Sequence, residues 1–230
     1  RSLVDCISGE YYKRRVVEAL SALAHTTGAL LLAEGIEREE DAVASLEAGA
    51  DLFQGYLFSR PVPAAAAGED LFPKIDSIAK ICRHRAAESL AKLRAAELTF
   101  SSAVEELART LPDTEAVRVE EKLRGWIAGV PDCECVYLLD VSGFQVGPTV
   151  CSEAVFSGGR SASYLYRPAD AGTDHSRKEY FYMAKGTGTV FITAPYISLA
   201  TGSMCRTFSV LVGCSGSECF ILCADFRSMK

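Results

Sequence analysis

The first 63 residues contain two short apolar segments, each following a helical pattern, and this arrangement limits the folds open to the chain. Residues 12–24 and 38–48 show the apolar spacing of amphipathic helices, whereas 29–33 and 51–58 are short apolar segments typical of strands. Alternating helices and strands with short links are typical of a parallel α/β fold. Two strands do not form a stable sheet alone, because each needs neighbours for its backbone hydrogen bonds. We therefore expect this stretch to be part of a larger domain.

A long helix and an antiparallel module are predicted after this stretch. Apolar residues recur at three- and four-residue spacing between Glu69 and Leu111, which predicts a helix that packs on a domain or forms a coiled coil with a second copy. Glu97 interrupts this apolar seam. The turn signal from Asp140 to Gly143 indicates a hairpin. The remaining helical and strand-like patterns cover residues 114–127, 135–140, 188–192, 205–212 and 218–226. They predict an α+β module of the size of a sensor domain.

Composition and charge exclude several classes of function. The net charge of −6 argues against nucleic acid or an anionic membrane as the main partner, because both need a basic surface. No apolar segment is long enough to span a membrane, and residues 1–10 lack the pattern of a signal peptide. The nine cysteines show no zinc-type spacing, so we expect small buried thiols, with a metal or redox site as the alternative. A reducing cytoplasm is the expected location.

Polar side chains follow both apolar segments of the first stretch at corresponding places. Glu34 follows the apolar segment 29–33 and precedes a glycine, and Gln54 follows the residues from Asp51 to Phe53 and also precedes a glycine. In parallel α/β barrels, the carboxyl ends of the strands form the edge at which chemistry takes place. Glu37 adds a second carboxylate close to Glu34. The three residues are thus candidates for catalysis or metal binding, although residues at such positions also cap loops without any chemical role.

The same residues carry a resemblance to a known family. The segments from Ala33 to Glu37 and from Gln54 to Phe58, followed by Pro61, resemble the last third of an EAL domain. The segments 1–4 and 14–17 resemble the part of that family that follows its sixth strand. The resemblance implies a TIM-type barrel that hydrolyses cyclic-di-GMP to the linear dinucleotide pGpG with Mg²⁺ or Mn²⁺.

The resemblance also implies roles for individual residues. Glu34 matches the late active-site glutamate beside the metal ions, Glu37 a supporting carboxylate, and Gln54 a glutamine near the catalytic water. Phe58 and Pro61 match a wall close to the guanine of the substrate. The other metal-ligating residues of the family would precede residue 1, so no metal is expected in this stretch alone. Whether the parent protein hydrolyses cyclic-di-GMP or binds it as a receptor stays open at this point.

A second resemblance covers the last part of the chain. Residues 174–184, 193–198, 201–202 and 207–209 resemble a Cache-type or PAS-like sensor domain. The resemblance implies that Arg177 and Tyr180 hold a ligand carboxylate, and that Tyr196 and Asp225 bind an amine. The other interpretation is that Arg177 forms a surface ion pair with a neighbouring acid and that the tyrosines belong to the core.

Together these features predict a cyclic-di-GMP signalling protein with three parts. Residues 1–63 would be the C-terminal part of an EAL barrel, 64–111 the final barrel helix and a connecting helix, and 112–230 a Cache/PAS-like sensor that binds a small molecule. We expect a cytoplasmic homodimer whose sensor controls hydrolysis of cyclic-di-GMP. The alternatives are a non-catalytic cyclic-di-GMP receptor and a sensor or dimerisation module without a catalytic role. A further output domain, such as a diguanylate cyclase, could follow residue 230.

Overall fold

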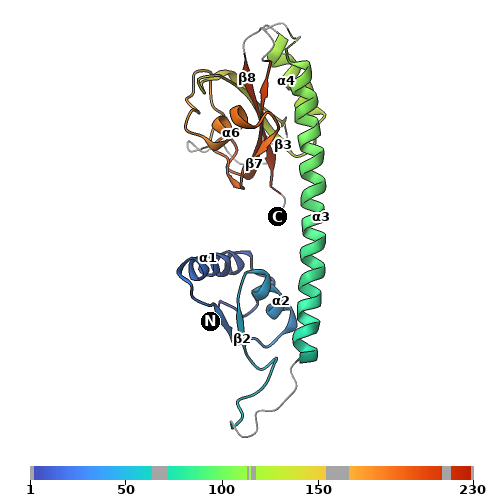
Figure 1. The fold of residues 1–230 in the computed structure, drawn as a ribbon, viewed down its shortest axis with the longest axis vertical. Helices are drawn as coiled ribbons and strands as arrows, with labels where there is room; N and C mark the ends of the chain where they lie inside the picture. Colours follow the sequence, from blue (N-terminus) through green and yellow to red (C-terminus); the bar gives the residue numbers. More distant parts are fainter. Residues whose placement is uncertain are drawn as a thin grey trace. The chain divides into compact units, whose positions relative to one another are not determined.

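The computed structural model separates the chain into two compact units. It describes residues 3–63, 72–112, 114, 118–153, 166–213 and 219–228. The first unit is Arg1–Lys92 and the second is Leu93–Lys230. Helix α3 (Phe72–Thr110) contributes its first part to one unit and its last part to the other. In Figure 1 the colours follow the chain from blue at its start to red at its end.

The first unit has the predicted order of helix, strand, helix and strand. Helix α1 (Tyr11–Thr27) is followed by strand β1 (Leu32–Glu34), helix α2 (Glu39–Glu47) and strand β2 (Leu52–Gln54). The two strands pair in parallel. Strand β2 is shorter than the predicted segment 51–58, because residues after Gln54 form a turn in which the Phe58 amide donates to the Gly55 carbonyl (3.0 Å).

The core of the first unit lies on one side of the two strands. Side chains from β1, α2 and the start of α3 are buried together there, among them Ala33, Val43 and Ile78. The prediction that the first apolar segment is buried on both faces is wrong for this unit, because Leu30 and Leu32 are exposed. A single parallel pair covers only one of its faces with the helices that this unit supplies.

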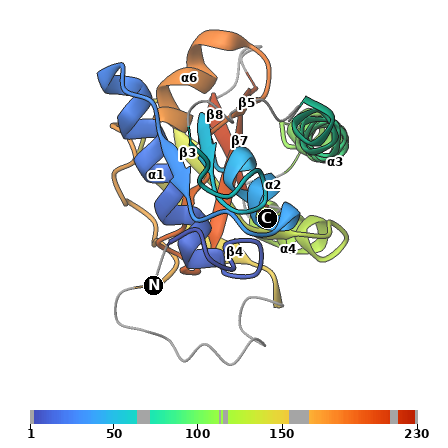
Figure 2. The ribbon, with the colours of Figure 1, turned by 90° about the horizontal axis from the view of Figure 1, so that it is seen from below.

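The second unit is an antiparallel sheet with helices on both faces. Its helices are α4 (Val119–Ala128), α6 (Glu179–Thr187) and the last part of α3. Its strands are β3 (Cys133–Asp140), β4 (Gln145–Cys151), β5 (Phe191–Ile192), β6 (Tyr196–Ile197), β7 (Met204–Val212) and β8 (Phe220–Arg227). The strand order is β4-β3-β8-β7-β5, with β6 also paired to β7. Figure 2 shows α4 and α6 on opposite sides of this sheet.

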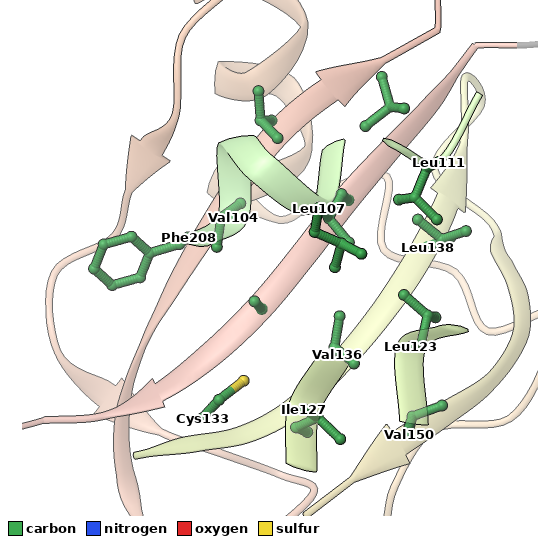
Figure 3. Packing of buried hydrophobic residues seen from close by; sticks show 14 of the residues in the cluster. Val104, Leu107, Leu111, Leu123, Ile127, Cys133, Val136, Leu138, Val150 and Phe208 are labelled. Carbon is green, nitrogen blue, oxygen red and sulfur yellow. The ribbon is translucent and has the colours of Figure 1, made fainter. Parts of the chain in front are cut away.

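Two hydrophobic clusters hold the sheet between its helices. On the first face, Val104 and Leu107 of α3 and Leu123 of α4 pack against residues of the strands that include Val136 and Phe208 (Figure 3). On the second face, Tyr180, Phe181 and Ala184 of α6 pack against Tyr137, Leu139, Ile221 and Cys223. Alternate residues of each strand therefore face different helices, as the pleat of a strand requires.

The predicted apolar seam of the long helix serves two different cores. Ile78 is buried in the first unit, and Val104 and Leu107 are buried in the second. A homodimer through this helix stays a prediction. None of the helices in the described residues combines the length and the hydrophobicity that crossing a bilayer requires.

Several boundaries differ from those predicted. The predicted strand 188–192 starts only at Phe191, because Gly188 ends α6 in a left-handed conformation (φ 64°). Helix α4 starts at Val119 rather than at Thr114, although residues 115–117 of the predicted range lie outside the described residues. The hairpin at Asp140 to Gly143 is confirmed by the antiparallel pairing of β3 with β4.

Candidate functional site

The structure brings Glu34 and Gln54 side by side. They are the last residues of β1 and β2, and they are register partners in the parallel pair. Both side chains are exposed, as is that of Glu37 in the link between β1 and α2. The expected convergence of two polar side chains at the carboxyl edge of the strands is therefore present.

The loop after Glu34 is held tightly against the loop after Gln54. The Ile36 amide donates to the Gln54 carbonyl (3.1 Å), and the Leu57 amide donates to the Ile36 carbonyl (3.0 Å). A Cβ atom at Gly55 would lie 2.0 Å from the Ile36 carbonyl oxygen, so only glycine fits this crossing. The glycine that follows Gln54 thus lets the two backbones approach and fixes the two strand ends relative to each other.

An aspartate at the opposite end of β2 anchors the same pair of strands. The Asp51 carboxylate accepts a hydrogen bond from the Leu31 amide (2.8 Å), and one of its oxygens lies 3.1 Å from His25 Nε2 at the end of α1. The Leu31 amide is the largest cause that lowers the pKa of Asp51. The acid therefore holds the amino ends of both strands, and its role is structural.

Phe58 and Pro61 lie in different surroundings. The ring of Phe58 is half-buried, and its centroid lies 6.3 Å from that of Phe53, which packs against the core of the first unit. Pro61 is exposed. Part of the Phe58 side chain is thus available beside the strand ends, while the rest packs in the core. Their predicted contact with a guanine base stays a prediction.

The chemistry of Glu34 fits one ligand of a hard divalent cation. Carboxylate oxygens are the preferred ligands of Mg²⁺ and Mn²⁺. Within the described residues, no three His, Cys, Asp or Glu side chains gather closely enough to hold a metal ion. The role of Glu34 as a metal ligand therefore stays a prediction.

A second group of functional candidates lies in one row across the sheet of the second unit. Asp225 on β8 is the register partner of both Thr207 on β7 and Cys135 on β3, so the three side chains share one face. Thr207 Oγ1 donates to Asp225 Oδ1 (2.8 Å), and the Tyr196 hydroxyl lies 2.6 Å from Thr207 Oγ1. Because Thr207 has one hydroxyl proton, Tyr196 must be the donor in that second bond.

The Asp225 carboxyl is buried in this row. Burial raises its pKa to about 7, although the hydrogen bond from Thr207 opposes the shift. The same burial raises the pKa of Tyr196 and, near it, the pKa of the Cys205 thiol to about 12. The Asp225 carboxyl therefore ionises less readily than an exposed aspartate, because it lies away from water.

Tyr180 belongs to a neighbouring hydrogen-bonded network. Its hydroxyl oxygen lies 2.8 Å from His175 Nδ1, and His175 Nε2 lies 3.1 Å from Gln145 Oε1. The amide nitrogen of Gln145 donates to the Ala169 carbonyl (3.1 Å), so its oxygen accepts from His175 Nε2. Burial lowers the pKa of His175, and the neutral ring then accepts the Tyr180 proton at Nδ1. This network fixes the start of α6.

Arg177 does not join the other three predicted sensor residues. Its side chain is exposed, and in the part of the chain that the structure describes no hydrogen bond or ion pair links it to Tyr180, Tyr196 or Asp225. The alternative, an ion pair of Arg177 with Asp174 or Glu179, is not present among the described residues either. The Ser176 amide donates to the Asp174 carboxylate (2.8 Å), and Ser176, followed by the charge of Arg177, lowers the pKa of Asp174. The structure thus brings together Tyr196 and Asp225, with Tyr180 on the same face and Arg177 outside.

A cavity of about 560 Å³ opens on the opposite face of this sheet. Its lining is mainly apolar and includes Leu111, Leu123, Leu138, Val146 and Val212. Leu123, Leu138 and Val212 belong to the cluster that packs with α3 and α4. The sheet therefore separates this cavity from Asp225, and its lining suits an apolar molecule.

The comparisons with known proteins agree with the geometry of the first unit. Residues 1–61 match the family model described as EAL domain. This stretch is EAL-domain sequence. The chain is also 44% identical over 48 residues to the cyclic di-GMP phosphodiesterase RocR of Pseudomonas aeruginosa, a match that covers 21% of this chain and 12% of that protein. The EAL stretch therefore includes Glu34, Glu37, Gln54 and Phe58.

Solved structures resemble both units. The Bacillus subtilis YkuI protein, which has an EAL domain and was solved with substrate c-di-GMP and calcium, is 22% identical and has a TM-score of 0.72, covering 94% of this chain and 53% of that one. The sensory domain of the Campylobacter jejuni chemoreceptor Tlp3, solved with isoleucine, is 14% identical with a TM-score of 0.50, covering 70% of this chain and 64% of that one. The second unit has this Cache/PAS-like sensor fold. The chain spans about half of the YkuI structure.

Sequence patterns missed several residues that the structure places in the row around Asp225. Thr207, Cys135 and Cys151 are brought there by the pairing of four strands. The alternation of polar and apolar residues along 207–210 was the available signal, because it places Thr207 and Ser209 on one face. The sequence did not indicate which strands pair with the strand that carries Asp225.

Proposed function

We propose that residues 1–61 act within a complete EAL domain that hydrolyses cyclic-di-GMP with divalent metal ions. The observation that carries this proposal is the register pairing of Glu34 with Gln54 at the carboxyl ends of two parallel strands. The match of this stretch to the EAL family and to RocR supports the substrate. A complete domain would also cover the exposed apolar side chains of Leu32 and Leu52.

In this proposal each polar residue has a defined task. Glu34 would be a ligand of Mg²⁺ or Mn²⁺, and such ions lower the pKa of bound water and neutralise phosphodiester charge. Gln54 would orient the water through its side-chain amide, because it lies on the neighbouring strand end. Glu37 would support Glu34 as a second carboxylate. Phe58 and Pro61 would form a wall for the base.

The test is an assay of cyclic-di-GMP hydrolysis with Mg²⁺ by the full-length protein. We expect Glu34→Gln to lower kcat/KM by more than about 100-fold, beyond the 10–100-fold typical of residues around metal ligands, and Gln54→Ala to lower it by about 10–100-fold. Glu40→Gln, which removes an exposed carboxylate from α2, is the matched control and should leave the rate unchanged. Binding of cyclic-di-GMP without turnover by the unaltered protein would instead indicate a receptor.

A second function is carried by the buried carboxyl of Asp225. We propose that the second unit binds a small molecule with an amino group, which Asp225 and Tyr196 would recognise on the α6 side of the sheet. The raised pKa of Asp225 supports this role, because a buried acid without a cation nearby is held partly neutral. Occupancy of this site would control the EAL domain, and deletion of the second unit would then change the rate of hydrolysis.

Calorimetry of the protein with a panel of amines and amino acids tests the second function. A ligand at Asp225 should bind more tightly at pH 8 than at pH 6, and Asp225→Asn should weaken it. A ligand whose binding is unchanged by Asp225→Asn but is lost in Val146→Trp would occupy the apolar cavity on the other face. That result would reject Asp225 as the recognition group.

A further inference from the structure

Two thiols face each other across the hairpin of β3 and β4. Cys135 and Cys151 are register partners, and their Sγ atoms lie 2.9 Å apart. The Ser152 amide donates to the Glu134 carbonyl (2.9 Å), one residue beyond this pair on each strand. Cys135 and Cys151 therefore occupy a position without mutual backbone hydrogen bonds, where Cα atoms are about 4.5 Å apart. That separation lies within the range of disulfides, about 4.4–6.8 Å, so no backbone movement is needed to join them.

The two thiols differ in access to solvent. Cys135 is fully buried, whereas Cys151 is half-buried at the end of β4, which is an edge strand of the sheet. The hydrogen bond between the two sulfurs lowers the pKa of Cys151 and, together with burial, raises the pKa of Cys135. Cys151 is thus the member of the pair that a dissolved oxidant reaches and that ionises more readily.

Among the described residues, no second cysteine sulfur is recorded beside the other buried thiols of this sheet, Cys133, Cys205 and Cys223. Cys133 lies in the cluster on the opposite face, and its sulfur donates to the Cys135 carbonyl oxygen (3.6 Å). Cys223 lies under α6. Among the described cysteines, Cys135 and Cys151 are both free thiols, so each has a sulfur that can react.

We propose that Cys135 and Cys151 are a redox modification site, at which a low-molecular-weight disulfide converts the two thiols into a reversible intrachain disulfide. The Cys151 thiolate attacks the small disulfide, forms a mixed disulfide and releases one small thiolate. The Cys135 sulfur then attacks Cys151 Sγ, forms the intrachain bond and releases the second small thiolate, which takes up the Cys135 proton. Two protein thiols are oxidised, and one small disulfide is reduced to two thiols.

The position of the pair connects this chemistry to the candidate ligand site. Cys135 is the register partner of Asp225, and Cys151 continues the same row on β4. A bond between them would tie the edge strand covalently to the strand beside Asp225. The oxidation state of the pair would then set how freely this edge of the site moves, which makes the second unit a sensor of thiol redox state in addition to any ligand.

Incubation of the reduced protein with oxidised glutathione tests the proposal. After denaturation and alkylation of the remaining thiols, peptide mass spectrometry shows which cysteines have reacted. We expect loss of alkylation at both Cys135 and Cys151, a peptide that links them, and full recovery of both thiols after dithiothreitol. Cys82, a half-buried thiol of the first unit, is the internal control and should not appear in a cross-linked peptide.

Single variants separate the two exchange steps. In Cys135→Ser, Cys151 should accumulate as the mixed disulfide with glutathione, because the resolving thiol is absent. In Cys151→Ser, Cys135 should stay reduced, because it is buried. The proposal is overturned if Cys151 of the unaltered protein ends as a lasting mixed disulfide or as a free thiol. Oxidation of Cys135 at an unchanged rate in Cys151→Ser would overturn the order of attack.

Discussion

The Arg206 guanidinium on β7 donates a hydrogen bond to Glu97 Oε1 on α3, and its Nε donates another to the Thr193 carbonyl oxygen (2.9 Å). Glu97 is the residue that interrupts the apolar seam of the long helix. Its partner explains the interruption, because both side chains are largely shielded from water and neutralise each other. The helix is therefore fixed to the sheet of the second unit by an ion pair as well as by apolar packing.

Replacement of Glu97 by leucine should destabilise the protein although it completes the apolar seam. The variant leaves the partly buried Arg206 without its carboxylate, and such losses typically cost about 1–3 kcal/mol of unfolding free energy. Chemical denaturation measures the effect. Glu105→Leu, at an exposed position of the same helix, is the control and should change stability little. Stabilisation by Glu97→Leu would show that the ion pair contributes nothing.

Phe100 should be a main contact between α3 and the sheet. Its ring stacks on that of Phe226 with centroids 4.2 Å apart and meets that of Phe208 edge-on at 5.8 Å. We expect Phe100→Ala to lower the free energy of unfolding by about 3 kcal/mol, in the range for truncated core aromatics. Leu98→Ala on the same helix removes a side chain that is 71% exposed and should cost less than about 0.5 kcal/mol. Equal effects of the two variants would contradict this packing.

Gly55→Ala should disturb the two candidate residues of the EAL stretch together. The added Cβ would lie 2.0 Å from the Ile36 carbonyl oxygen, so the loops after Glu34 and Gln54 must move apart. We expect a loss of at least about 2 kcal/mol in stability, of the size seen for overpacked sites. Gly9→Ala is the matched control, because its Cβ would meet nothing closer than 3.9 Å. Thermal denaturation compares the two, and an unchanged midpoint for Gly55→Ala would refute the close crossing.

The buried Asp225 should make stability fall as the pH rises. Its pKa is about 7 in the folded protein against 3.8 as the ordinary value, so the folded state retains a proton that the unfolded state releases between these values. Relative to Asp225→Asn, the protein should lose roughly 3 kcal/mol of stability between pH 4 and pH 7, and little more above. Urea titrations at several pH values in this range measure the free energy of unfolding of both proteins, and hence the difference between them. If the difference in unfolding free energy between the two proteins does not change with pH, Asp225 is ionised in the folded protein over the whole range.

Local sequence patterns predicted much of the architecture because they depend on neighbours in the chain. The strands ending at Glu34 and Gln54 follow from short apolar segments before a glycine, and the hairpin at Asp140 to Gly143 follows from its turn residues. The match of residues 1–61 to the EAL family confirms the resemblance that these residues carry. The resemblance to known sensors also indicated Asp225 and Tyr196 as candidates for ligand binding. The predicted domain boundaries after residues 63 and 111 stay a prediction.

The arrangement around Asp225 was decided by tertiary structure alone. Thr207 and Cys135 meet Asp225 only because β7 and β3 pair with β8 in one register, and a shift of one residue would turn each side chain to the other face. The facing thiols of Cys135 and Cys151 depend on the same kind of register. The amino-acid sequence by itself indicated most of the helices and strands, since that choice is largely local, although α6 and β6 were not among the predicted segments. Pairing between distant strands decided which side chains share a site, because its energy comes from contacts that no local pattern encodes.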